Sequence, residues 1–301
     1  MTHANPASSA SRDLPADEHP QVVACIDGSE AALGVCDYAA WASQRMGAPL
    51  LLLHVLDDEK YPARTDMTGN IGLGSREHLL DELVALDQQR SKLALKHGHV
   101  MLDEAEKRVR ADGATDVHQR QRHDELAGSL VALEPEARLF VLGLHGEGRP
   151  GQGGHVGSQL ETVIRSVHRP LLLVPDDFAE PRSAMLAFDG SATAFRSIEL
   201  LAGTPVFRGM PLHLVLVGTD NERNRSLLAD ASGALANQGM DIHTAIRSGD
   251  VEPALHSYQE ENDIDVLIMG AYGHSVIRRF LVGSTTTRML ETARKPLVIL
   301  R

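Results

Sequence analysis

Short apolar runs alternate with helical patterns along most of this chain. Runs 50–55, 139–143 and 212–217 have the length and composition of strands buried on both faces. Residues 31–46 place apolar side chains every three or four positions and end at Gly47, which is typical of a helix packed on a sheet. Because buried strands joined by helices form parallel sheets, the pattern predicts an α/β sandwich.

The same pattern occurs twice, in the same order. An apolar run that ends in Asp-Gly-Ser occupies residues 22–29 and again residues 184–191. The other matches pair 50–55 with 212–217, 139–143 with 266–270, Gly157-Ser158 with Gly283-Ser284, and 169–174 with 295–300. Five matches in one order indicate a tandem repeat of one domain.

The repeat predicts two domains, which is also what a length of 301 residues favours. We expect a disordered polar arm over residues 1–20, which lacks the apolar segment of a signal peptide. A first domain is expected over 21–175 and a second over 183–301, joined by a linker that is rich in proline and polar residues, 176–182.

The first domain carries an insertion. Segment 27–170 spans 143 positions and its counterpart 189–296 spans 107, so the first is longer by 36. Most of the excess falls at about residues 57–104, where a turn-rich part precedes leucines at helical spacing. We expect a loop and an extra helical stretch that covers one flank. The sequence leaves open whether this insertion only packs or forms a lid or a partner surface.

Composition narrows the function classes. A net charge of −12 argues against non-specific nucleic-acid binding, which needs a basic surface. No run approaches the roughly 20 apolar residues of a membrane span, so we expect no membrane partner and a cytoplasmic location. The two cysteines, Cys25 and Cys36, fall in a predicted strand and the following helix. We expect both to be buried thiols in a reducing cytosol.

A glycine motif carries the strongest functional signal. Gly270-Ala271-Tyr272-Gly273 follows an apolar run over 264–269, and Gly283-Ser284-Thr285 follows after nine residues, before a predicted helix over 286–294. Glycines after a strand let the backbone turn sharply and approach a ligand. Free N–H groups and hydroxyls at a helix start suit a phosphate. The motif therefore predicts a nucleotide site.

Ligands of such sheets bind beyond the carboxyl ends of the strands. An adenine base would lie against Val217, ribose hydroxyls would meet Asp189 or the backbone near Gly270, and phosphates would sit on the amides of the glycine motif. The predicted nucleotide-binding residues of the second domain are Phe188, Asp189, Val217, Met269, Gly270, Gly273, Gly283, Ser284 and Thr285.

These features resemble the universal stress protein family, whose ATP-binding members carry Gly-x2-Gly-x9-Gly-(Ser/Thr). Residues 270–285 match that motif without a gap, and the resemblance covers the chain from Gln21 onward, twice. The resemblance implies an adenine nucleotide alpha hydrolase-like, Rossmann-like fold with five parallel strands per domain. The family's last strand usually makes the dimer contact. We therefore expect 171–174 and 297–300 to pair within one chain as an internal pseudo-dimer, and a further homodimer is left open.

The first domain departs from the motif. Ten residues, not nine, separate Gly143-Leu144-His145-Gly146 from Gly157-Ser158, and four of them are glycines. Each glycine adds up to about 1 kcal/mol to the cost of ordering that loop relative to alanine. Gln159 stands where the second domain has Thr285. A second nucleotide site is expected here only in modified form, from Ile26, Asp27, Val55, Gly143, Gly146, Gly157 and Ser158.

Several alternatives stay open from the residues alone. Asp27 and Asp189 would either help hold a phosphate-bound Mg²⁺ or cap the next helix with help from Ser29 and Ser191. The favoured function is an ATP-binding stress-response sensor or regulator with unknown protein partners. The alternatives are slow ATP hydrolysis or self-phosphorylation, and a scaffold or small-lipid carrier with non-functional nucleotide pockets. We assign no catalytic residue.

Overall fold

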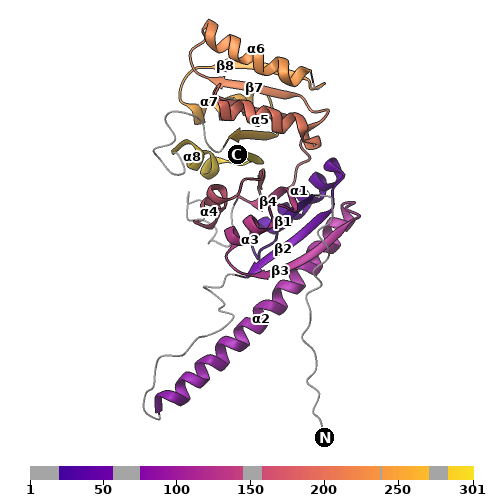
Figure 1. Cartoon of the computed structure of the whole chain (residues 1–301), viewed down its shortest axis with the longest axis vertical. Coiled ribbons are helices and arrows are strands. Elements are labelled where there is room, and N and C mark those ends of the chain that lie inside the picture. The colour runs from indigo at the N-terminus through magenta and orange to yellow at the C-terminus, as the bar shows by residue number, and fades with distance from the viewer. Residues whose placement is uncertain (1–19, 57–74, 145–157, 238, 271–283) are drawn as a thin grey trace.

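The computed structural model describes residues 20–56, 75–144, 158–237, 239–270 and 284–301 (Figure 1). Strands and helices alternate along the chain, as the apolar pattern predicts. The first half contains β1 (Gln21–Cys25), α1 (Ala31–Met46), β2 (Leu50–Leu56), α2 (Ser75–Ala111), β3 (Val117–His123), α3 (Leu126–Leu133), β4 (Ala137–Gly143), α4 (Ser158–Ser166) and β5 (Leu171–Val174). The second half contains β6 (Ala184–Phe188), α5 (Ala192–Gly203), the 3-10 turn η1 (Pro205–Phe207), β7 (Leu212–Val217), α6 (Glu222–Ala236), β8 (Ile242–Arg247), α7 (Val251–Glu261), β9 (Val266–Gly270), α8 (Ser284–Thr292) and β10 (Leu297–Leu300).

All these strands belong to one 10-stranded sheet. Its order is β3-β2-β1-β4-β5-β10-β9-β6-β7-β8, so each half contributes five strands in the same topological order. Within each half the strands pair in parallel. The order reverses on either side of β1 and of β6, which places a switch point beside the carboxyl end of each of these strands.

The two halves join through their last strands. β5 and β10 pair antiparallel, with Leu173 opposite Leu297 and Leu171 opposite Ile299. All four residues of each strand are buried. The predicted pairing of 171–174 with 297–300 is therefore confirmed, and the chain forms a pseudo-dimer around one continuous sheet.

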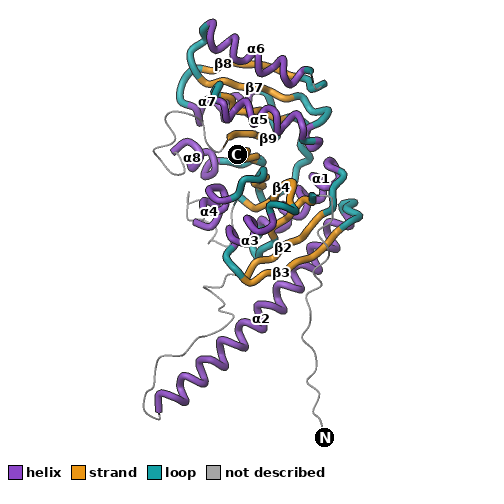
Figure 2. The backbone as a smooth tube through the Cα atoms, in the orientation of Figure 1, coloured by secondary structure: helices purple, strands orange, loops and turns teal. Residues whose placement is uncertain are grey.

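Helices cover both faces of the sheet (Figure 2). One apolar core joins one face of the strands to α1, α2, α5 and α6, and it runs through both halves. The other core joins the opposite face to α3, α4, α7 and α8. Side chains alternate between the faces: Val22 and Ala24 of β1 belong to the first core and Val23 to the second.

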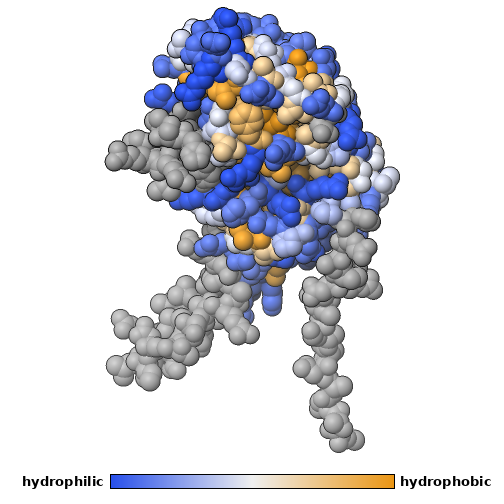
Figure 3. Space-filling model, turned by 45° about the horizontal axis from the view of Figure 1, so that its top comes forward, coloured by the Kyte–Doolittle hydropathy of each residue, from blue (hydrophilic) through white to orange (hydrophobic). Residues whose placement is uncertain are grey.

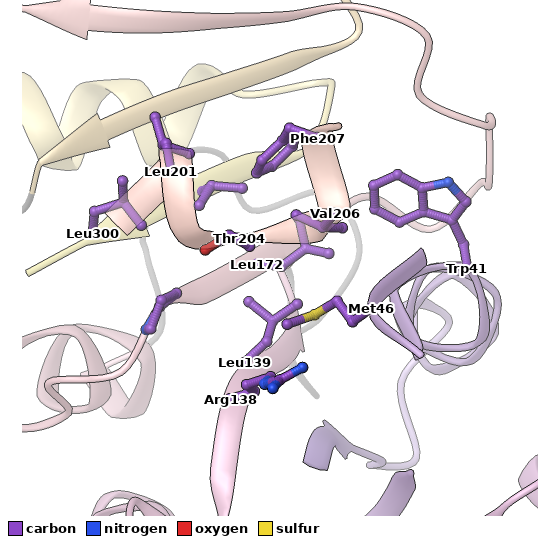
Figure 4. Close-up of a pocket in the computed structure, with 12 residues that line it drawn as sticks. Trp41, Met46, Arg138, Leu139, Leu172, Leu201, Thr204, Val206, Phe207 and Leu300 are labelled. Carbon is purple, nitrogen blue, oxygen red and sulfur yellow. The ribbon is translucent and has the colours of Figure 1, made fainter. Parts of the chain in front are cut away.

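Contacts beside the central strands also tie the first half to the linker and to the second half. The Tyr38 ring on α1 meets Phe178 edge-on at 4.7 Å, and the Tyr38 hydroxyl lies 3.2 Å from both the backbone N–H and the carbonyl oxygen of Ala179. Arg45 donates from Nε to the carbonyl oxygen of Val206 in η1 at 3.1 Å. A small apolar pocket lies in this junction, where Trp41, Met46, Leu139, Leu172, Val206, Phe207 and Leu300 converge (Figure 4).

A local sequence rule accounts for the end of α1. α1 ends where Gly47 adopts φ 55°, a left-handed conformation that glycine takes without a Cβ penalty. All six apolar positions that define its predicted stripe are buried: Ala31, Val35, Tyr38, Ala39, Ala42 and Met46. The helix predicted over 286–294 is observed two residues earlier, from Ser284 to Thr292.

The insertion agrees with its prediction in part. The extra helical stretch is present as an extension of α2, which has 37 residues against 15 in its counterpart α6. Only the C-terminal part of α2 packs on the sheet, and the N-terminal part projects away from the body (Figure 1). The expectation that the insertion covers one flank is therefore wrong for that part. The predicted arm and the turn-rich part of the insertion lie outside the described residues.

The face of the molecule drawn in Figure 3 is mostly hydrophilic, with hydrophobic residues in scattered patches. Within the described segments, no helix is both long and apolar enough to cross a membrane. Apolar residues are instead concentrated in the two cores along the sheet.

Candidate nucleotide site

In the second half, the fold brings the predicted residues to one edge of the sheet. β6 pairs with β9 on one side and with β7 on the other. Phe188 ends β6 and Asp189 follows it, Val217 ends β7, and Gly270 ends β9 directly after Met269. α8 begins nearby in the sequence at Ser284, after the glycine motif. The carboxyl ends of three neighbouring strands therefore carry the base- and ribose-binding candidates.

A tight turn follows β6. Gly190 has φ 70°, and an added Cβ there would lie 2.8 Å from Cδ1 of Leu227, so both conformation and space favour glycine. Oδ1 of Asp189 accepts a hydrogen bond from the Ser191 N–H at 2.9 Å. Oγ of Ser191 accepts from the Ala194 N–H at 3.1 Å and caps α5. Ser191 is thus the helix cap, and Asp189 holds the turn that precedes it.

The β9 end of this site adjoins a buried serine. Ser197 on α5 is 2% exposed and donates from Oγ to the carbonyl oxygen of Thr193 at 3.1 Å. Its Oγ lies 3.7 Å from where a Cβ on Gly270 would stand. Ser197 was not among the predicted site residues, because a serine inside a helix carries no signal of which strand end it meets.

The loop after β7 borders the site on its other side, and its residues beyond Val217 were not among the predicted nucleotide-binding residues. Gly218 N–H donates to the carbonyl oxygen of Arg247 at 2.7 Å. Nδ2 of Asn224 donates to the carbonyl oxygen of Thr219 at 2.8 Å, and Oδ1 of Asn221 accepts from the Asn224 N–H at 2.9 Å. The available signal was Asn221 three residues before Asn224, a spacing typical of a helix N-cap.

The first half repeats this arrangement with different contacts. Ile26 and Asp27 follow β1, Val55 lies near the end of β2, and Gly143 ends β4. Oδ1 of Asp27 accepts from the Ser29 N–H at 3.1 Å and also from the Ser29 hydroxyl. The residue before α1, Glu30, makes no side-chain cap. Ser29 is therefore bound to the aspartate instead of capping the helix as Ser191 does.

His54 gives the first half a further contact beside its candidate site. Its ring is buried, and Nδ1 donates to the carbonyl oxygen of Ile26 at 2.8 Å. The contact ties the end of β2 to the residue that follows β1. We therefore assign His54 a structural role, holding the backbone beside Asp27.

Part of both predicted sites lies outside the described residues: Gly146, Gly157, Gly273 and Gly283. Ser158 begins α4, and Ser284 and Thr285 begin α8, so the structure places the backbone of these three at helix starts. Such starts present free backbone N–H groups, which favour anions.

The surroundings of the two cysteines favour the thiol over the thiolate. Burial raises the pKa of the Cys36 thiol to about 12, and burial together with Asp27 raises the pKa of Cys25 far above its ordinary value. Both therefore remain thiols at neutral pH. Among the described side chains, no three histidines, cysteines or carboxylates are grouped as a metal site would require.

Comparison with known proteins agrees with this architecture. The model of the universal stress protein family matches residues 19–175 and 210–301. The chain belongs to this family. It is 33% identical to the universal stress protein Slr1230 of Synechocystis sp. over 284 residues, which cover 93% of this chain and 99% of that protein.

Two solved structures share the fold of this universal stress protein. One is a universal stress protein from Archaeoglobus fulgidus, at TM-score 0.64 and 18% identity, covering 93% of this chain and 96% of that one. The other is a putative universal stress protein from Pseudomonas aeruginosa, at TM-score 0.57 and 14% identity, covering 95% and 94%. At these identities the likeness supports the fold alone.

Proposed function

We propose that this universal stress protein binds ATP in its second half and acts in the cytoplasm as a nucleotide-dependent sensor or regulator. One observation carries the proposal. Asp189, Val217 and Gly270 lie at the carboxyl ends of neighbouring strands, and α8 starts after an unbroken Gly-x2-Gly-x9-Gly-Ser motif. This is the edge at which open α/β sheets bind ligands.

Each part of the nucleotide has a partner of matching chemistry. The half-buried Val217 offers an apolar surface to the base. Oδ1 of Asp189 already accepts from the Ser191 N–H, so we assign its second carboxylate oxygen to a ribose hydroxyl or a phosphate-bound Mg²⁺. The N–H groups at the start of α8 would receive the phosphates, where the helix dipole adds to their attraction.

The first half is proposed as a weaker or empty site. Its motif is one residue longer, and its ten-residue loop contains four glycines. Binding must therefore restrict more backbone conformations than in the second half. Gln159 also replaces the hydroxyl residue Thr285. We expect one strong site per chain, with any binding in the first half of lower affinity.

The experiment is titration calorimetry of the full chain with ATP and Mg²⁺, after its nucleotide content as purified has been measured. Gly283→Val should remove the strong site, because a branched side chain would block the approach of the phosphates. Gly157→Val should leave that site unchanged. Gly203→Val is the matched control, since an added Cβ there meets nothing within 4 Å.

The outcomes are distinct. No bound nucleotide and no heat with the wild-type chain would overturn the proposal. Equal affinity in wild type and Gly283→Val would remove the second-half site from it. Steady release of ADP during the titration would instead favour the slow-ATPase alternative, and a circular dichroism spectrum for each variant would establish that the fold is intact.

A further inference from the structure

Helix α2 has two parts with opposite surroundings. Its C-terminal part is buried against α1, β2 and β3, where Leu102 is 1% exposed and Val109 is fully buried. Its N-terminal part extends away from the body (Figure 1). There Leu86 is 61% exposed and Leu93 is 67% exposed. Large apolar side chains on a projecting helix call for an explanation other than packing within the chain.

The exposed leucines belong to a regular stripe. The residues of this stripe, most of them apolar, recur along α2 at alternating intervals of four and three positions. This is the spacing of a coiled-coil seam. Leu86, Arg90, Leu93 and His97 line one shallow groove on the helix surface, together with Gln89 and Ala94. The full stripe is Leu79, Leu83, Leu86, Arg90, Leu93, His97 and Val100.

The length of the stripe suits pairing with another helix. Residues 79–100 cover about three heptads, the lower end of what a coiled coil needs. A helix that projects into water without packing is only marginally stable, because its stability comes mostly from burying an apolar face. The two polar positions of the stripe, Arg90 and His97, reduce affinity and restrict which register and partner are allowed.

Charge along the helix indicates what that partner is. Residues 75–89 contain four acidic residues and one basic residue, a net charge of −3, whereas residues 90–100 contain three basic residues and no acidic one, a net charge of +3. The helix is therefore complementary to itself when it is reversed. A second copy of the same helix, running antiparallel, places the acidic N-terminal part of one copy beside the basic part of the other.

The flanking heptad positions favour the same orientation. With Leu86 and Leu93 at position d, position g holds Glu82, Gln89 and Lys96. In an antiparallel pair, g faces g and e faces e, so acidic position 82 of each copy lies opposite Lys96 of the other, and one acidic pair forms between the two positions 87. In a parallel pair, g faces e of the next heptad, so acidic positions 82 and 87 lie opposite each other twice and no opposite-charge pair forms.

We propose that two copies of this protein associate through antiparallel pairing of the N-terminal parts of α2. In this register, position 93 of one copy lies opposite position 83 of the other, and Arg90 lies opposite Leu86. The two Gln89 residues meet at the centre of the pair. This surface is separate from the β5–β10 junction, so the pseudo-dimer inside one chain becomes a building block of a larger symmetric dimer.

Sedimentation velocity of the full chain over a concentration series tests the association. We expect a monomer–dimer equilibrium for the wild type and a monomer for Leu93→Glu. Leu33→Glu is the matched control, because Leu33 is also a helix leucine and 55% exposed but lies on α1. A wild-type chain that stays monomeric up to its solubility limit, or a dimer that Leu93→Glu leaves intact, would overturn the proposal.

A charge exchange tests the orientation. Glu82→Lys alone and Lys96→Glu alone should each weaken the dimer, because each creates two like-charge contacts across the pair. The double variant restores two opposite-charge contacts and should recover dimer formation. Failure of the double variant to exceed both single variants would contradict antiparallel pairing.

Crosslinking tests the register. Gln89→Cys should form a disulfide-linked dimer under mild oxidation, because both copies place residue 89 at the crossing point. Gln88→Cys is the control, since Gln88 is exposed and adjacent but falls at position f, away from the seam. Equal crosslinking of the two variants would show random collision instead of the proposed pair.

Discussion

The two halves of this universal stress protein share a frame and differ in what is attached to it. Each has five strands in the same order and an aspartate turn after its first strand. They differ in the helix after the second strand, with 37 residues in α2 and 15 in α6, and in the serine of the turn. We infer that the shared sheet determines where a site can form, whereas the loops and helix ends determine whether each half binds a ligand there.

The largest expected effect compares two positions of α2, one in its buried C-terminal part and one in a part that packs less closely. Leu102→Ala should lower the free energy of unfolding by about 2–5 kcal/mol, because it opens a cavity against the sheet. Leu95→Ala, at a residue that is 39% exposed, should change it by less than about 0.5 kcal/mol. Urea unfolding followed by circular dichroism measures both. Equal losses would mean that the two parts of α2 are equally packed.

A second comparison uses one glycine inside α2 and one inside α6. An added Cβ at Gly98 would stand 2.5 Å from Cδ2 of the buried His54 ring, so Gly98→Ala should cost about 1–3 kcal/mol. At Gly233 an added Cβ meets nothing within 4 Å, so Gly233→Ala should stabilise the protein by about 0.5–1 kcal/mol. Thermal unfolding should show shifts of opposite sign, and shifts of one sign would contradict the close approach of α2 to His54.

A smaller difference is expected between the two turn serines. Ser191→Ala removes the cap of α5 and should cost about 1 kcal/mol. Ser29→Ala should cost less, because the Ser29 hydroxyl donates to Asp27 and caps no helix. Chemical unfolding without nucleotide measures both values. A larger loss for Ser29→Ala would show that the hydrogen bond to Asp27 matters more than a helix cap.

The smallest expected effect depends on pH. His213 of β7 stacks on His243 at 4.7 Å, and its Nδ1 lies 2.7 Å from the Tyr258 hydroxyl. Burial, and then the neighbouring His243, lower the pKa of His213, while Asp241 opposes this shift. As the pH falls through about 6.5, the unfolded chain takes up a proton that the folded chain resists, so stability decreases.

The matched variant gives β7 the residue that the first half has at the corresponding position. The corresponding residue of β2 is Leu51, so His213→Leu gives β7 the same residue at that position. The variant should lose less stability between about pH 7.5 and about pH 5.5 than the wild type does. The free energy of unfolding at several pH values measures the slope. An unchanged slope would show that His213 is protonated equally in the folded and unfolded states.

Sequence patterns predicted the strands buried on both faces but not those at the sheet edges. The runs that became β2 and β7 are apolar except for one histidine each, because helices cover both of their faces. The edge strands β3 and β8 have the sequences VHQRQRH and IHTAIR, in which few apolar residues recur. An edge strand needs little burial, so its sequence carries little signal and its place is decided by the neighbouring strand.

The candidate site divides in the same way. Asp189, Val217 and Gly270 were predictable because strand ends in a parallel sheet meet at one edge. Ser197 was not, because its position depends on how α5 crosses the sheet. For the loop from Gly218 to Asn224, the N-cap spacing of Asn221 predicts the start of α6 but not the place of the loop beside the site. The placement of Gly273 and Gly283 in this site stays a prediction.

Sequence patterns were sufficient to predict the tandem repeat and the α/β fold, since apolar periodicity and glycine spacing are local properties, and the family resemblance implied the pairing of the last strands. Tertiary structure was needed to show that Ser29 and Ser191 have different partners. It was also needed to show that the N-terminal part of α2 projects away from the body. These outcomes depend on which surfaces meet in space, and equally spaced leucines have the same pattern whether they face a sheet or water.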